Sequence, residues 1–260
     1  MFSKKIADTL KELKDNYHAC GVKAEFAAEA SSIEEVIRLN NLANNIGLDL
    51  TVKIGGCEAV KDILDAKSIG AKTIVAPMIE SPFALQKFVE ASQCVFSNEE
   101  LNNINLFANI ESICAFDNLN AIIKSDSAKY IKGIVMGRTD MAHSLGLNCS
   151  DVNSEKIFEL AETIASKTKE QKKEFIIGGG ISPASIIFLK RLNVDLDKFE
   201  TRKIVFNSKI INEDSCKDGI KKAIDFEIMW IKNKENYGTL TTQDLKRIKL
   251  LKTRYNMELG

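Results

Sequence analysis

Residues 133–146, GIVMGRTDMAHSLG, carry more information about fold and function than any other stretch of this sequence. The first five residues form an apolar run that is typical of a buried strand. The run leads directly into Arg138 and Asp140, and then to His143, one of only two histidines in the chain. Functional side chains of parallel α/β sheets and barrels lie at the carboxyl ends of strands, so this junction predicts a site.

Further apolar runs precede and follow this stretch, and each is followed by a segment with helical spacing. A repeated alternation of strands and helices predicts a parallel sheet covered by helices. About seven such units in 260 residues suit a (β/α)₈ barrel or a doubly wound open sheet, and periodicity leaves both possible. The other runs are VKAEFAAEA (22–30), LDLTVKIGG (48–56), KTIVAPMIES (72–81), INLFANIES (104–112), EFIIGGGIS (174–182) and RKIVFNS (202–208).

Composition and charge favour a globular protein that acts on a small molecule. The 36 basic residues balance the 36 acidic ones, which argues against a nucleic-acid or membrane partner. The six cysteines lie far apart with no CxxC pair, which predicts reduced, buried thiols rather than a zinc or disulfide framework. The charged N-terminus resembles no signal peptide, and no transmembrane segment is apparent, so we expect a cytoplasmic protein.

Residues 212–260 predict two helices. Residues 212–234 form a long amphipathic pattern that would close the outer ring of a barrel. Residues 241–257, TTQDLKRIKLLKTRYNM, predict a further helix with a threonine cap. We therefore expect a barrel domain over residues 1–234 and a helical extension over residues 235–260, used either for a subunit contact in a homo-oligomer or for packing. The apolar side of this last helix would carry Leu245, Ile248, Leu251 and Tyr255.

Acidic residues recur where the predicted strands end. Isolated buried carboxylates are costly, whereas a divalent cation such as Mg²⁺ or Mn²⁺ compensates their charge. The alternative is that these acids cap helices in the first turn after each strand. The acids in question are Glu29, Glu80, Glu111 and Asp140, with Lys53 near the end of the run at 48–56.

Three segments together resemble the HpcH/HpaI aldolase and citrate lyase β-subunit family. They are TVKIGGCEAVKDILDAKSIGAKTIVAPMIESPFAL (51–85), NLFANIESICAFDNLNAII (105–123) and IKGIVMGRTDMAHSLGL (131–147). The family has a strand ending in Ile-Glu-(Ser/Thr), and a later strand ending in Gly-x-x-Asp-Leu before a Ser-Leu-Gly turn. The similarity covers about residues 50–148.

The resemblance implies a (β/α)₈ TIM-type barrel with Mg²⁺ or Mn²⁺ bound by Glu111 and Asp140. The metal of this family chelates a small, pyruvate-like 2-oxo acid and stabilises the enolate formed when a bond beside the carbonyl is made or broken. We expect Glu80, Gly137 and Thr139, which lie at the same strand ends, to contact the substrate.

The sequence departs from the family pattern in its acid–base groups. Lys53 stands where the family usually has an arginine, so it supplies charge without a bidentate fork. A Schiff base is the alternative for this lysine, although nearby acids would raise its pKa and pair with it. The family's histidine base is missing near residues 24–32, which leaves Glu25 or Glu29 nearby, and His143 is either a base or a surface residue.

Two arginines and a glycine-rich turn complete the predicted site. Arg138 stands where relatives have proline or a small residue, and it would pair with a substrate anion or with a neighbouring acid. Arg202 would recognise a substrate anion if it points inward from the last strand. Gly179 and Gly180 belong to a turn that either cradles a phosphate or requires positive φ angles.

Our leading hypothesis is a metal-dependent carbon–carbon lyase or aldolase that acts on a small 2-oxo acid or related carboxylate. The first alternative is a phosphosugar aldolase that uses the turn at residues 178–180. The second is a degenerate barrel that serves as a binding or assembly subunit. Since residues 1–16 read as a helix where the family opens with a strand, we also expect an incomplete or irregularly closed barrel.

Overall fold

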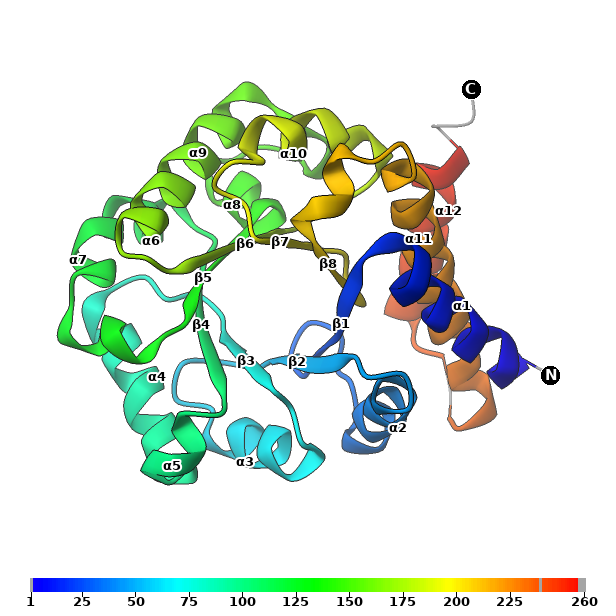
Figure 1. Cartoon of the computed structure of the whole chain (residues 1–260), viewed down its shortest axis with the longest axis horizontal. Helices are drawn as coiled ribbons and strands as arrows, with labels where there is room; N and C mark the ends of the chain where they lie inside the picture. Colours follow the sequence, from blue (N-terminus) through cyan, green and yellow to red (C-terminus); the bar gives the residue numbers. More distant parts are fainter. Residues whose placement is uncertain (1, 239, 257–260) are drawn as a thin grey trace.

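The computed structural model describes residues 2–238 and 240–256, in which eight strands close into a barrel (Figure 1). The strands follow one another around the barrel in chain order, so the α/β TIM-type fold is confirmed. Apolar runs separated by helices produce this order because each helix returns the chain to the start of the next parallel strand. The strands are β1 (Ala19–Glu25), β2 (Asp49–Lys53), β3 (Thr73–Ala76), β4 (Asn105–Ile110), β5 (Gly133–Gly137), β6 (Glu174–Gly178), β7 (Lys198–Glu200) and β8 (Ile204–Asn207).

The last strand breaks the parallel pattern. Strands β1 to β7 pair in parallel, whereas β8 runs antiparallel to both β7 and β1. Only residues 201–203 connect β7 to β8, which is too short for the helical crossover that a parallel pair needs. The expectation of a wholly parallel sheet is therefore wrong for β8. The irregular closure lies where β8 meets β1, with a register shift between Ala19 and Gly21.

Helices form the outer ring of the barrel (Figure 1). Several begin at serine caps, as at Ser32 and Ser81, whose side chains accept the backbone N–H of the residue three positions later. They are α2 (Ile33–Asn44), α3 (Val60–Ile69), α4 (Pro82–Val95), α5 (Asn98–Leu101), α6 (Ile113–Asp117), α7 (Leu119–Ile123), α8 (Arg138–Ser144), α9 (Glu155–Glu170) and α10 (Ile186–Leu192), with 3₁₀ turns at η1 (Asp126–Tyr130), η2 (Cys149–Asn153), η3 (Pro183–Ser185), η4 (Ser208–Asn212) and η5 (Lys234–Asn236).

Helix α1 (Phe2–Tyr17) precedes the first strand and lies beside α11 (Cys216–Asn233) (Figure 1). Its residues Ile6, Leu10 and Leu13 recur at helical spacing and are buried. Helix α11 lies within residues 212–234, where the sequence predicts a long helix, and it packs against α1. The pair covers the seam where β8 and β1 close the barrel.

Alternation along the strands divides the core into two layers. Outward residues such as Val22, Leu50 and Ile134 are fully buried against the helices. Inside the barrel, one apolar cluster is formed by Val75, Phe107, Val135 and Ile176. The inward side chains nearer the carboxyl ends of the strands are polar, and they form the site described below.

Helix α12 (Thr242–Asn256) packs against α11 through Ile248 and Leu251, while Leu245 is mostly exposed. The expected contact of Tyr255 and residues 239 and 257–260 of the extension lie outside what the structure describes. None of the helices within the described ranges has both the length and the apolar character needed to cross a bilayer.

All six cysteines are free, but their burial differs from expectation. Cys94, Cys114 and Cys149 are exposed, whereas Cys216 is buried. The prediction of buried thiols relied on the apolar runs beside Cys94, Cys114 and Cys149. It was wrong for these three residues because a segment that is mostly buried can still carry an exposed residue near its end.

Candidate active site

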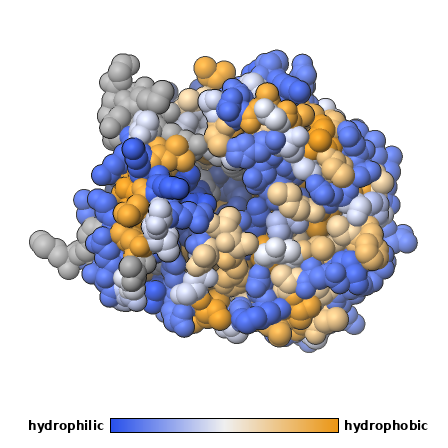
Figure 2. Space-filling view, turned by 180° about the vertical axis from the view of Figure 1, so that it is seen from behind, coloured by the Kyte–Doolittle hydropathy of each residue, from blue (hydrophilic) through white to orange (hydrophobic). Residues whose placement is uncertain are grey.

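A cavity of about 240 Å³ lies at the carboxyl ends of the strands. Seen from behind, the molecule is hollowed at its centre, and hydrophilic residues line the hollow (Figure 2). Strands, the turns that follow them and the last two helices all contribute to the wall. Its charged residues are Lys23, Glu25, Lys53, Glu111, Asp140, Glu200, Arg202, Glu227 and Arg247.

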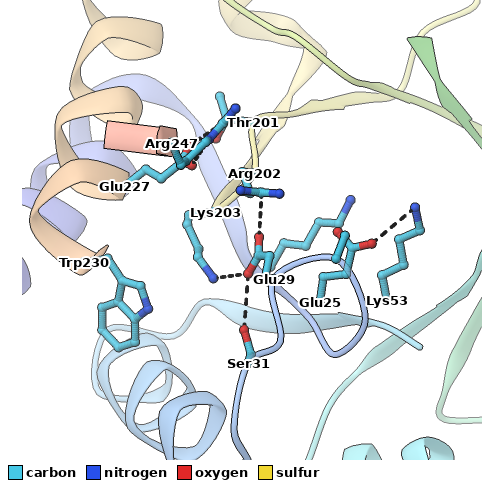
Figure 3. Close-up of polar contacts among 12 residues, drawn as sticks. Glu25, Glu29, Ser31, Lys53, Thr201, Arg202, Lys203, Glu227, Trp230 and Arg247 are labelled. Atoms are coloured by element: carbon cyan, nitrogen blue, oxygen red, sulfur yellow. Dashed lines mark hydrogen bonds and ion pairs between the residues drawn. The ribbon is translucent and has the colours of Figure 1, made fainter. Parts of the chain in front are cut away.

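Lys53 at the end of β2 pairs with two carboxylates. Its Nζ lies 3.1 Å from Glu111 Oε2 and 3.5 Å from Glu25 Oε1, the second pair being drawn in Figure 3. Parallel register places Glu25 directly beside Lys53. Burial by itself would lower the pKa of Lys53, but Glu111, Glu25 and Asp140 outweigh it and raise that pKa. Lys53 is therefore a stable cation, as the sequence indicated, and poorly suited to Schiff-base formation.

Glu111 is the most enclosed acid of this group, with 1% of its surface exposed. Its Oε1 accepts the backbone N–H of Met78 at 3.1 Å, and its Oε2 accepts Asn109 Nδ2 at 2.6 Å as well as Lys53. Burial is the main reason that its pKa is raised, with Asp140 adding to the effect and Lys53 opposing it. Met78 has a φ angle of +50°, an uncommon backbone conformation for a residue other than glycine. In this conformation its backbone N–H donates to Glu111 and orients the carboxylate.

Gly137 makes room for this carboxylate. A Cβ added at Gly137 would lie 2.5 Å from Glu111 Oε2, closer than real contacts allow. Glycine at the end of β5 is therefore required by the side chain at the end of β4. The sequence indicated Gly137 as a substrate contact, and the structure adds this packing role on the cavity wall.

Asp140, in the first turn of α8, lines the same cavity as Glu111. Its charge raises the pKa of Glu111 and of Lys53, so the three groups are electrostatically linked. No group of three His, Cys, Asp or Glu residues that could hold a metal ion occurs in the part of the chain that the structure describes. The structure nevertheless brings together both acids that the sequence predicted as metal ligands.

The donor chemistry of the cavity fits a hard divalent cation. Mg²⁺ is commonly held by one or two protein carboxylates, with water or substrate oxygens completing its shell. Glu111 Oε1 accepts a single hydrogen bond and so retains acceptor capacity. The cavity wall also carries five carboxylates against four cationic side chains, an excess that an added cation would offset.

Glu29 lies outside this cavity, contrary to its expected catalytic position. Its carboxylate pairs with Lys203 and Arg202 and accepts a hydrogen bond from Ser31 Oγ at 3.3 Å (Figure 3). These contacts fasten the β7–β8 turn to the loop after β1. Of the two acids near the missing family histidine, Glu25 is the one that lines the cavity.

Arg138 is fully buried and is not part of the cavity wall. Its guanidinium donates to the carbonyls of Gly178 and Gly179 and to Asn153 Oδ1, at 3.2, 2.8 and 2.8 Å. The side chain also lies over the ring of Phe188. The structure thus places Arg138 where it holds the glycine turn, outside the cavity wall.

The glycine turn after β6 reaches the cavity at Gly179 and Gly180. Their φ angles are +81° and +65°, which favour glycine. A Cβ at Gly179 would lie 2.6 Å from the backbone nitrogen of Thr139. The turn thus packs closely against the start of α8, and Thr139 lines the cavity beside it.

Two predicted residues lie elsewhere. His143 is exposed on α8, with its Nε2 3.0 Å from Cys149 Sγ. Glu80 accepts a hydrogen bond from the side chain of Ser112, the N-cap residue of α6, and it lies in the first turn of neither α4 nor α6. Neither residue lines the cavity.

The structure adds charged residues that sequence reasoning missed. Arg247 of α12 forms a bidentate pair with Glu227 of α11, with Nε–Oε1 at 2.7 Å and Nη2–Oε2 at 3.1 Å (Figure 3). Lys23 of β1 pairs with Glu200 of β7 inside the barrel. One signal was available: Glu227 interrupts an apolar helical pattern, and a buried acid needs a partner.

Comparisons with known proteins agree with this architecture. The family model described as HpcH/HpaI aldolase/citrate lyase matches residues 18–176. Among solved structures, an HpcH/HpaI aldolase from Desulfitobacterium hafniense DCB-2 is 14% identical with a TM-score of 0.62, covering 75% of this chain and 81% of that one. No curated protein sequence matches the chain.

Two further structures are similar. A HpcH/HpaI aldolase/citrate lyase family protein from Burkholderia cenocepacia J2315 is 15% identical with a TM-score of 0.59, covering 77% of this chain and 84% of that one. Citrate synthase SbnG is 18% identical with a TM-score of 0.58, covering 75% and 82%. At these identities, the likeness establishes the shared fold.

Proposed function

Because the chain belongs to the HpcH/HpaI aldolase/citrate lyase family, we propose that it is a divalent-metal-dependent carbon–carbon lyase. Membership of this family supports a lyase or aldolase type of enzyme. The substrate would be a small 2-oxo acid, pyruvate-like in size, that reacts through its enolate. The observation that carries the proposal is the meeting of Glu111, Asp140 and Lys53 in one cavity at the carboxyl ends of the strands.

Glu111 and Asp140 would hold the metal. When bound there, Mg²⁺ or Mn²⁺ supplies a Lewis acid for the carbonyl oxygen of the substrate. Glu111 is well prepared for this task because Met78 N–H and Asn109 fix its two oxygens. Lys53 contributes a positive charge inside a partly enclosed site, where charge stabilisation is stronger than in water.

Glu25 is the acid–base group that we assign to proton transfer. Its carboxylate lines the cavity and is held by Lys53 Nζ at 3.5 Å. In the cleavage direction, Glu25 takes the proton of the substrate hydroxyl, the carbon–carbon bond breaks, and its electron pair passes to the carbonyl as the enolate forms. The proton on Glu25 then returns to the enolate carbon, which leaves a free 2-oxo acid and an aldehyde or ketone.

The size of the cavity supports a small substrate. Its volume of about 240 Å³ is below the range of roughly 300–1,000 Å³ typical of sites for drug-sized ligands. Apolar side chains such as Ile181 and Leu251 stand among the polar ones on the wall. They would help to keep water away from the enolate.

Deuterium exchange of pyruvate tests this proposal without knowledge of the partner aldehyde. We expect the methyl proton signal of pyruvate to decay in D₂O with Mg²⁺ or Mn²⁺, and to persist with chelator or in Glu111→Gln. Glu155→Gln, at an exposed ion pair with Arg191, provides the matched control and should exchange like the wild type. No metal-dependent exchange in the wild type would refute enolate chemistry on pyruvate.

A further inference from the structure

We propose that Arg202 and Arg247 form a second anion subsite, which binds a carboxylate or phosphate at the far end of the substrate. This inference rests on the proposed function, because it extends the same substrate beyond its 2-oxo acid group. The two arginines come from separate elements, the β7–β8 turn and helix α12, and both line the cavity.

Arg202 is held in place while its hydrogen-bond donors remain available. Its Nε lies 3.2 Å from Glu29 Oε1, near enough for an ion pair. That oxygen nevertheless receives no hydrogen bond from any described residue, so the contact is an ion pair without a hydrogen bond. The guanidinium, with the side chain 26% exposed, therefore has its N–H groups available to a ligand at the cavity.

Arg247 is held by two hydrogen bonds, and one nitrogen of its guanidinium stays available to a ligand. Its Nε and Nη2 donate to the two oxygens of Glu227, which is 1% exposed. This leaves Nη1 without a hydrogen bond to any residue that the structure describes. A guanidinium fixed along one edge by a buried carboxylate is preorganised to bind an anion with the other.

Local charge also favours an anion. Glu29 pairs with Arg202 and Lys203 and also acts electrostatically on Arg247, so these three cations together with the carboxylates of Glu29 and Glu227 carry a net positive charge before any ligand arrives. The Arg247–Glu227 pair is neutral as a whole. A ligand carboxylate or phosphate would therefore complete the charge balance at Arg202 and take up the donors of both guanidinium groups.

A second cavity shows that a longer substrate has room. It encloses about 270 Å³ between the loop after β1 and helices α11 and α12. Arg202 and Arg247 line both this cavity and the one that contains Glu111. The arginines thus stand at the boundary of two spaces, where an anionic group several bonds away from the reacting carbon would lie.

Calorimetry with matched 2-oxo acids tests the subsite. 2-Oxopentanoate and 2-oxoglutarate have the same chain length, but only the second ends in a carboxylate; 3-phosphohydroxypyruvate carries a phosphate instead. We expect 2-oxoglutarate or the phosphate compound to bind about ten- to a hundredfold more tightly than 2-oxopentanoate, because this is the gain in affinity that charge-assisted hydrogen bonds typically provide. The better of the two identifies the preferred anion.

Two variants assign this preference to the arginines. Arg202→Gln should bring the affinity ratio close to one, and it leaves Glu29 paired with Lys203. Arg247→Lys keeps a cation beside Glu227 but removes the free Nη1, and should reduce the ratio several-fold. Arg191→Gln alters an exposed arginine outside both cavities and should retain the wild-type ratio.

The outcomes separate this inference from the proposed function. Pyruvate exchange together with an affinity ratio near one, or with no binding of any of the three acids, would overturn the subsite alone. A large ratio that falls in Arg202→Gln, without pyruvate exchange, would retain the subsite and overturn the proposed enolate chemistry.

Discussion

Lys53 Nζ lies 3.1 Å from Glu111 Oε2, so a cation at the end of β2 neutralises an almost fully buried carboxylate at the mouth of the barrel. The pair forms because parallel strands end at one rim and their inward positions alternate. Each partner changes the proton affinity of the other: Lys53 lowers the pKa of Glu111, against burial, and Glu111 raises the pKa of Lys53.

Removal of Lys53 should therefore change the pH dependence of catalysis. In Lys53→Met, burial still raises the pKa of Glu111, but the opposing effect of the lysine is lost. Since the reaction needs Glu111 ionised, the acid limb of the pyruvate exchange profile should move to higher pH. Lys61→Met, at an exposed pair with Asp65, is the control. An unchanged acid limb would show that Glu111 does not govern it.

Glu25→Gln should separate proton transfer from metal binding. If Glu25 is the acid–base group, exchange should fall by roughly 10²- to 10⁴-fold. Stabilisation by Mn²⁺ should persist, because Glu111 and Asp140 are left intact. Exchange at the wild-type rate would exclude Glu25 and return attention to the other groups of the cavity.

Metal should stabilise the folded protein. At a free Mn²⁺ concentration of about 100 times Kd, binding adds about 2.7 kcal/mol to the free energy of unfolding. For a chain of this size, that corresponds to a rise in Tm of roughly 5–10 °C, which chelator should reverse. Glu111→Gln should abolish the rise in a thermal scan. A rise of equal size in this variant would place the metal elsewhere.

Gly137→Ala should displace the Glu111 carboxylate without removing it. The new Cβ would lie 2.5 Å from Glu111 Oε2, so either the side chain or strand β5 must move. We expect weaker Mn²⁺ binding and a lower Tm. Gly56→Ala is the matched control, because a Cβ at Gly56 has no heavy atom within 4 Å. Equal behaviour of both variants would argue against this steric role.

The Glu227–Arg247 pair should anchor the C-terminal helix. Arg247→Met leaves Glu227 buried and unpaired, which should lower the free energy of unfolding by about 3–5 kcal/mol. In the double variant Glu227→Met/Arg247→Met, no charge is left uncompensated, and most of that loss should be recovered. Urea unfolding of the wild type, Glu227→Met, Arg247→Met and the double variant measures the coupling free energy between the two residues. Additive losses would show that the two residues act independently.

The family resemblance and the local sequence pattern predict much of the candidate site. Lys53, Glu111 and Asp140 each follow or end an apolar run, and parallel strands bring such positions to one rim. Glu80 and His143 satisfied the same local rule, yet they do not line the cavity. The rule places a residue near the rim, but the path of the following turn decides whether its side chain faces inward.

By itself, the sequence determined the strand–helix alternation, the polar character of the strand ends and the acidic pair Glu111 and Asp140, because these depend on local spacing and short motifs. The tertiary structure decided the antiparallel direction of β8, the burial of Arg138 against the glycine turn and the approach of Arg247 to Glu227. These features depend on contacts between segments distant in the chain, which compete for the same space and charge and leave no periodic pattern.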